Sequence, residues 1–226
     1  MNLLRSYEFF QPEECRERIH IIGCGAIGST LAENLIRLGL TKISIYDFDK
    51  VESHNIANQM YRQIDIKKEK VDALFEMLSD INPEIKDIEN GFKIVRKGYT
   101  DQKLSGYVFL CVDSIELRKE ICESNKFNTC IKAVFDFRMR LTDAQHFAAD
   151  WRDKKMVANL IKTMQFSHEE ALADTPVSAC NSPLSVAPTI RSIVAYGVSN
   201  FMNFVKGKSL KTLIVTYPFD YVVDAF

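Results

Sequence analysis

The chain reads IHIIGCGAIG from Ile19 to Gly28, and this stretch decides the fold. Its apolar, β-branched start at 19–22 predicts a buried strand. Residues 29–38 carry apolar side chains at helical spacing and are followed by Gly39, which predicts a helix that ends there. The glycines therefore join a strand to a helix, an arrangement in which the helix N-terminus binds phosphate.

Three glycines of this turn have separate physical roles. Gly23 permits the tight turn, Gly25 lets a phosphate approach the backbone, and Gly28 lets the helix pack closely on the strand. The glycine spacing predicts a nucleotide-binding site but does not indicate which nucleotide binds there.

A second apolar run, at 43–46, predicts the next strand, and Asp47 follows it. A carboxylate at this position accepts hydrogen bonds from ribose hydroxyls, which fits NAD as well as ATP. A P-loop is disfavoured, because Ser29 follows the last glycine where that motif requires a lysine.

Further polar residues follow at spacings typical of one family. They are the segment DFDKVESHNIANQ from Asp47 to Gln59, then Lys70, Asn82-Pro83 and Asp113. In this order the chain resembles the ThiF/MoeB family of adenylyltransferases, which are related to ubiquitin-activating enzymes. The resemblance covers roughly residues 17–207.

The resemblance implies an ATP-dependent enzyme that activates the C-terminal carboxylate of a small ubiquitin-like or sulfur-carrier protein. It implies that one set of residues binds the nucleotide: Gly23, Gly25, Ala26, Gly28, Asp47, Asp49, Asn55, Gln59 and Lys70. It also implies that Lys70 sits against the phosphates and that Asp113 holds Mg²⁺, a hard cation that prefers oxygen ligands. The attacking carboxylate is already ionised at neutral pH, so a catalytic histidine is not required.

A loop rich in proline and small residues is expected at about 173–188, where the family has its crossover segment. In relatives a cysteine precedes the Ala-Pro pair that opens a long helix, and Cys180 holds that place here. The resemblance implies that Cys180 accepts the activated protein. An unreactive cysteine is the alternative.

The chain departs from the family at several positions. Ala26 replaces a glycine of the turn, Asn58 replaces a phosphate-contacting arginine, and Leu110 replaces the first member of an acidic pair. Arg62 is a candidate substitute for that arginine if its segment is helical. For Arg118, both a surface role and a role in the site stay open.

Strand and helix patterns alternate along the chain to about residue 135. Further strands are expected at 107–112, 131–137, 140–151, 210–216 and 221–223, and further helices at 67–81, 115–126 and 186–205. The predicted fold is a Rossmann-like three-layer α/β/α sheet, mostly parallel in its first half and mixed or antiparallel in its second. We expect one domain over 1–226, with its nucleotide-binding half at about 17–135.

The composition narrows the class of protein further. The 226 residues are 46% apolar with a net charge of −1, so neither nucleic acid nor a membrane is expected as partner. With no signal peptide and no long apolar run, we expect a cytoplasmic protein. The six cysteines form no C-x-x-C pair, so no zinc is expected.

The resemblance implies a homodimer, with the helix at 186–205 in its interface and an N-terminal arginine inserted from the neighbouring subunit. The candidates for this arginine near the N-terminus are Arg5, Arg16 and Arg18. Two other classes of function remain: an NAD-dependent oxidoreductase, and a catalytically weakened scaffold protein, which the change at Asn58 suggests.

Overall fold

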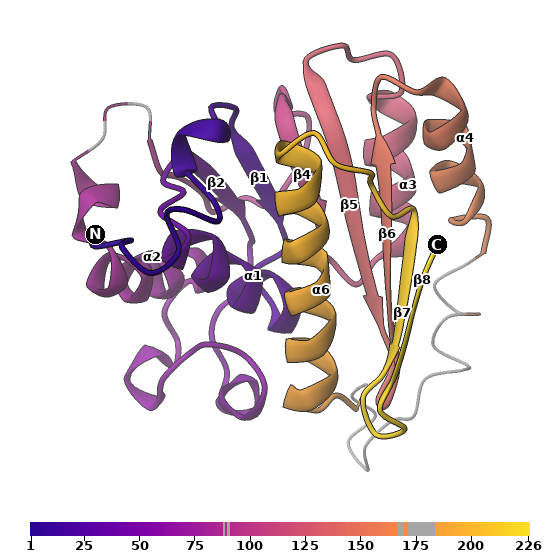
Figure 1. Ribbon diagram of the computed structural model, residues 1–226. Helices are drawn as coiled ribbons and strands as arrows, with labels where there is room; N and C mark the ends of the chain where they lie inside the picture. The colour runs from indigo at the N-terminus through magenta and orange to yellow at the C-terminus, as the bar shows by residue number, and fades with distance from the viewer. Residues whose placement is uncertain (88, 90, 167–169, 171–183) are drawn as a thin grey trace.

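The computed structural model describes residues 1–87, 89, 91–166, 170 and 184–226, and its strands form one eight-stranded sheet (Figure 1). The strands are β1 Ile19–Ile22, β2 Ile43–Tyr46, β3 Lys93–Val95, β4 Gly106–Leu110, β5 Ile131–Met139, β6 Ala144–Asp150, β7 Leu213–Tyr217 and β8 Val222–Ala225. Their order across the sheet is β3-β2-β1-β4-β5-β6-β7-β8.

The sheet changes character at β5. Strands β1 to β5 are parallel to one another, whereas β6, β7 and β8 are each antiparallel to the strand before them. The predicted division into a mostly parallel first half and an antiparallel second half is confirmed.

Helices cover both faces of the sheet. They are α1 Ala26–Arg37, α2 Lys70–Ile81, α3 Ile115–Ser124, α4 Lys154–Lys162 and α6 Ala187–Val205. The apolar residues of α1, α2 and α6 belong to one hydrophobic cluster, and those of α3 and α4 belong to another. Two helical layers therefore enclose the sheet, as the three-layer prediction requires.

Strand β4 shows how the sequence separates the two clusters. Phe109 stacks on Phe135 of β5 and meets Phe201 of α6 edge-on, on one face of the sheet. Its neighbours Val108 and Leu110 belong to the opposite cluster. Successive side chains of a strand point to opposite faces, so an entirely apolar strand packs against both helical layers.

Several element boundaries differ from the predicted ones. Helix α1 begins at Ala26, within the glycine motif, and β4 ends at Leu110 instead of continuing to residue 112. Strand β3 and helix α4 were not predicted from the sequence. Strand β3 is a short, partly exposed edge strand with no strong apolar pattern. Helix α4 is amphipathic, with Val157 and Leu160 buried on one face, so its helical spacing was a signal that could have predicted it.

The parallel strands bring their carboxyl ends to one edge of the sheet, where the turns after β1, β2 and β4 lie side by side. Helix α6 also begins at this edge (Figure 1). In open α/β sheets ligands bind outside the carboxyl ends of the strands. None of the helices described has both the length and the apolar character needed to cross a membrane.

Candidate functional site

The glycine turn after β1 is shaped by two close approaches of the backbone. Gly23 has φ of +96°, a conformation that side chains rarely adopt, and its N–H donates to Tyr46 O of β2 at 2.9 Å. A Cβ on Gly28 would lie 1.8 Å from Gly23 O. The chain therefore needs glycine at both positions to bring α1 against the strand.

The N-terminus of α1 is open. Gly25 is its N-cap, and no side chain caps the first N–H groups. A Cβ on Gly25 would meet no atom within 4 Å, so there is space beside the backbone here. Uncapped N–H groups and the helix dipole together favour an anion, and this end of α1 fits a phosphate group of ATP.

Asp47 fixes the glycine turn to the end of β2. Its Oδ2 accepts from Cys24 N–H at 2.6 Å, and its Oδ1 accepts from Asp49 N–H at 2.9 Å. Burial raises the pKa of Asp47 above its ordinary value, while these two donors and the charge of Lys70 oppose that shift. The carboxylate thus orients the turn, and its predicted contact with a ribose stays a prediction.

Lys70 is largely buried at this edge of the sheet. Its side chain is only 9% exposed, and Nζ lies 2.8 Å from Asp49 Oδ2. Its backbone N–H also donates to Asp49 O at 2.9 Å. The first residue of α2 is therefore fastened to the loop after β2, and Asp49 offsets its charge when no ligand is bound.

Asn55 and Gln59 lie on the segment that follows this loop. Asn55 is buried, and its Oδ1 accepts from Glu52 N–H at 2.9 Å, so it stabilises a 3₁₀ turn. Gln59 Oε1 is buried and has no donor among the described residues. A buried carbonyl oxygen without a donor is costly, and a bound ligand would relieve that cost.

Two residues that the sequence analysis missed fasten this segment to the glycine turn. Tyr61 OH donates to Cys24 O at 2.6 Å, and Met60 N–H donates to Ser29 Oγ at 3.2 Å. These two hydrogen bonds join the turn to residues 60–61. Sequence offers little signal for these contacts, because neither residue belongs to a motif with a stated chemistry.

Asp113 lies at the same edge, after β4, with an exposed side chain. Ser114, and not Asp113, caps α3, because its Oγ accepts a hydrogen bond from Leu117 N–H at 3.1 Å. Asp113 has no hydrogen-bond or ion-pair partner within the described part of the chain. Its carboxylate therefore stays available to a cation.

A buried ion cluster supports the turn that carries Asp113. Arg118 donates to Leu110 O at 3.3 Å and to Val112 O, and it is ion-paired with Asp136. Asp136 is completely buried and also pairs with Arg138 at 2.7 Å. The surface role considered for Arg118 is thus wrong. Asp136 was not predicted, because it lies within a strand, β5, whose pattern is mostly apolar.

Arg62 is not placed to replace the missing family arginine. Residues 58–62 are not helical. The Arg62 guanidinium binds Asp65, with Nε 2.9 Å from Oδ2, and also lies 3.7 Å from Asp80 Oδ2. Asn58 instead donates to Ser185 Oγ, which ties this segment to the residues just before α6.

The candidate arginines for a neighbouring subunit lie away from the carboxyl edge. Arg18 precedes β1 and donates to Ser44 Oγ and Gly91 O, so its side chain is used within its own chain. Arg5 and Arg16 are exposed. Cys180 and most of the expected crossover loop at 173–188 lie outside the described residues.

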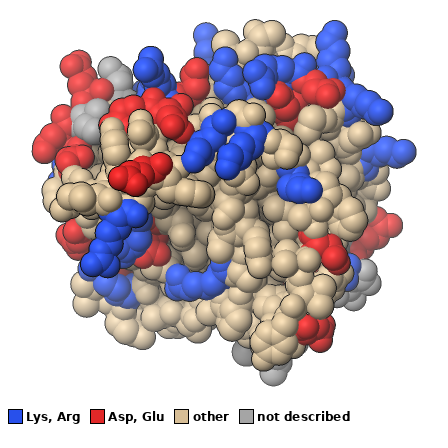
Figure 2. Space-filling view, in the orientation of Figure 1, with Lys and Arg blue, Asp and Glu red and all other residues tan. Residues whose placement is uncertain are grey.

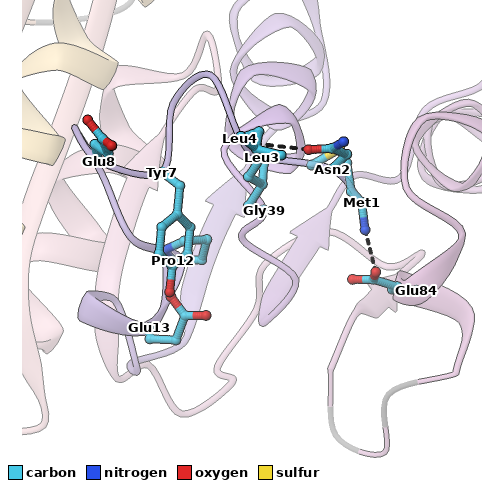
Figure 3. Close-up of a pocket in the computed structure, with 10 residues that line it drawn as sticks. All are labelled: Met1, Asn2, Leu3, Leu4, Tyr7, Glu8, Pro12, Glu13, Gly39 and Glu84. Atoms are coloured by element: carbon cyan, nitrogen blue, oxygen red, sulfur yellow. Dashed lines mark hydrogen bonds and ion pairs between the residues drawn. The ribbon is translucent and has the colours of Figure 1, made fainter.

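A cavity of about 550 Å³ lies on another part of the molecule, beside the N-terminal segment and the end of α1 (Figure 3). Leu3, Tyr7 and Gly39 line it, and the Met1 ammonium is ion-paired with Glu84 at its rim. None of the predicted site residues lines this cavity.

Within the described residues, no group of three or more His, Cys, Asp or Glu side chains could hold a metal ion.

Comparison with known proteins decides the family. The model of the ThiF family matches residues 11–134, which is more than half of the chain and includes the glycine turn, Lys70 and Asp113. The chain belongs to the ThiF family. The resemblance noted in the sequence is confirmed.

Among curated proteins, this ThiF-family chain is similar to ubiquitin-like modifier-activating enzyme 5. It is 26% identical to the Aedes aegypti protein over 194 residues, which are 84% of this chain and 45% of that protein. It is 32% identical to the Caenorhabditis elegans protein over 123 residues, which are 48% of this chain and 29% of that protein. The chain thus spans less than half the length of either relative.

Solved structures give the same fold. The crystal structure of E. coli MccB with ATP has a TM-score of 0.67 and 16% identity, covering 95% of this chain and 64% of that one. The structure of PaaA has a TM-score of 0.69, also at 16% identity, covering 95% of this chain and 65% of that one. At this identity the likeness establishes the Rossmann-like fold alone.

Proposed function

We propose that this chain is an ATP-dependent adenylyltransferase that activates the C-terminal carboxylate of a small ubiquitin-like or sulfur-carrier protein. The observation that carries the proposal is the open N-terminus of α1, flanked at one sheet edge by Asp47, the Lys70–Asp49 pair and the exposed Asp113. The relatives named above, enzymes that activate ubiquitin-like modifiers, support the same class of substrate.

The chemistry requires positioning and neutralisation of charge. A carboxylate oxygen of the substrate bonds to the α-phosphorus of ATP, the bond from that phosphorus to its bridging oxygen breaks, and pyrophosphate leaves. No proton moves, because the carboxylate is ionised at pH 7. The chain must therefore hold two anions together, which the uncapped N–H groups of α1 and the ammonium of Lys70 favour.

A bound Mg²⁺ would supply further positive charge for the reaction. Asp113 would hold it. One carboxylate is enough, because Mg²⁺ keeps several waters and takes its other ligands from the phosphates. The exposed, unpaired carboxylate of Asp113 fits this role better than Asp47 or Asp49, which are already engaged.

Two partners follow from the proposal. The first is the carrier protein, whose C-terminus must reach the edge where α6 begins. The second is another copy of this chain: the surface over α6 has few charged side chains (Figure 2), and Tyr196 is 40% exposed on it. Such a face suits a homodimer.

Transfer of the activated carrier to Cys180 would be a second step of the reaction. Both steps would take place on one adenylation domain, which we take as residues 1–226.

The test is ATP–pyrophosphate exchange by the full chain, with a panel of small ubiquitin-like and sulfur-carrier proteins that end in a free glycine. Each carrier is paired with a control that lacks the last glycine. Exchange that needs both the terminal glycine and Lys70 would support the proposal, and Cys180→Ala should leave exchange intact and block only transfer. ATP binding without exchange by any carrier would favour the scaffold alternative.

A further inference from the structure

Arg191 brings a guanidinium to the segment that fastens the glycine turn. It lies in the second turn of α6, is exposed, and its Nη2 is 3.3 Å from Met60 Sδ. Met60 N–H in turn donates to Ser29 Oγ in the first turn of α1. The start of α6 is also fixed here by the hydrogen bond from Asn58 to Ser185, so Arg191 is held close to the phosphate-binding end of α1.

Four other described cations are already engaged with carboxylates. Lys70 pairs with Asp49, and Arg62 pairs with Asp65. Arg118 and Arg138 share the buried Asp136.

Arg191 differs from these residues. Within the described part of the chain its recorded polar partner is a thioether sulfur, which is a weak acceptor. A guanidinium on a weak acceptor exchanges it readily for an oxyanion, and its fork of N–H groups matches phosphate oxygens.

Two buried oxygens beside Met60 point to the same exchange. Asn58 Oδ1 and Gln59 Oε1 have no hydrogen-bond donor among the described residues. A guanidinium carries five N–H donors, enough for a phosphate and for a neighbouring amide oxygen.

We propose that Arg191 is a nucleotide-binding residue that contacts the phosphates of ATP and steadies the pyrophosphate as it leaves. The inference rests on the proposed function and deepens it. ATP carries several negative charges, whereas the charge of Lys70 is already offset by Asp49. Arg191, which has no carboxylate partner among the described residues, adds a second positive charge against the phosphates and links the nucleotide to the segment that precedes α6.

The test is calorimetric titration of the full chain with Mg·ATP and, separately, with adenosine. Arg191→Ala should weaken Mg·ATP by about tenfold or more, the size expected for a lost charge-assisted hydrogen bond. Adenosine should bind as it does to the unchanged protein, because it has no phosphate. Arg191→Lys should recover part of the loss in affinity. The control is Arg62→Ala, which also removes an arginine, but one that is paired with a carboxylate; it should leave the affinity for Mg·ATP within about twofold of the unchanged protein.

The outcomes separate the two proposals. If the unchanged chain binds Mg·ATP and Lys70→Met abolishes binding but Arg191→Ala does not weaken it, this inference fails and the proposed function stands. Equal weakening of ATP and adenosine would show that Arg191 only shapes the surface, which also overturns the inference. If the unchanged chain binds no ATP, both proposals fail together.

Discussion

The turns after β1 and β4 lie side by side at one edge of the sheet, yet they are built from different interactions. The turn after β1 is defined by glycine, a helix N-terminus and two hydrogen bonds, one from Cys24 N–H to the Asp47 carboxylate and one from Tyr61 OH to Cys24 O. The turn after β4 rests on charge, since Arg118 holds two of its carbonyl groups and is itself held by Asp136.

This difference has physical consequences. The first turn depends on the absence of side-chain atoms, so a single methyl group is enough to disrupt it. The second depends on a closed set of buried charges, so removing one member leaves the others without compensation. Asp113 is carried by the second turn while the anion site is carried by the first, and substitutions should separate the two.

The largest expected effect is on the glycine turn. Gly28→Ala places a Cβ 1.8 Å from Gly23 O, and we expect it to lower the free energy of unfolding by about 4 kcal/mol or more. Gly25→Ala meets no neighbouring atom, so its free energy of unfolding should change by only about 0.5 kcal/mol. Urea unfolding of both variants measures this contrast, and equal losses would show that the turn is not packed as described.

The second effect is on the buried ion cluster. Asp136→Ala leaves Arg118 and Arg138 buried without their shared carboxylate, which should cost about 3–5 kcal/mol of unfolding free energy. Asp150→Ala removes a pair in which Arg152 is 68% exposed, and it should cost less than about 1 kcal/mol. Chemical denaturation of the two variants distinguishes them, and similar costs would contradict the role given to Asp136.

A smaller effect concerns pH and two histidines in the sheet. Burial lowers the pKa of His20 to about 4 and that of His146 to about 3. The unfolded chain takes up protons on both below about pH 6.5, whereas the folded chain does not, so their stability contribution is complete above pH 6.5 and falls as pH decreases.

We expect roughly 2–3 kcal/mol of stability to be lost between pH 7.5 and 5.5. The measurement is the unfolding free energy at the two pH values, in the unchanged chain and in His146→Gln, which should lose about half as much. His54, which is exposed, is the control position, and His54→Gln should behave like the unchanged chain. A pH-independent stability would show that neither buried histidine stays neutral.

Sequence predicted the first turn far better than the second. The first turn is set by local constraints, and each constraint determines the residue type at one position. They are visible in the glycine spacing, in the apolar runs around it and in the position of Asp47. The cluster of Arg118, Asp136 and Arg138 forms only when α3 packs behind β5, and nothing in the apolar pattern of β5 signals a buried carboxylate. The contacts of Tyr61, Met60 and Arg191 likewise depend on how separate segments meet, which periodicity does not describe.

The central claim is that the open end of α1 binds ATP and that Asp113 holds its magnesium ion. The most direct measurement is calorimetric titration of the full chain with ATP, with and without Mg²⁺, and with NAD⁺, repeated on Asp113→Ala. The account predicts that ATP binds, that NAD⁺ does not, and that Asp113→Ala weakens ATP binding only when Mg²⁺ is present. Binding of NAD⁺ in place of ATP, or a Mg²⁺ effect unchanged in Asp113→Ala, would contradict it.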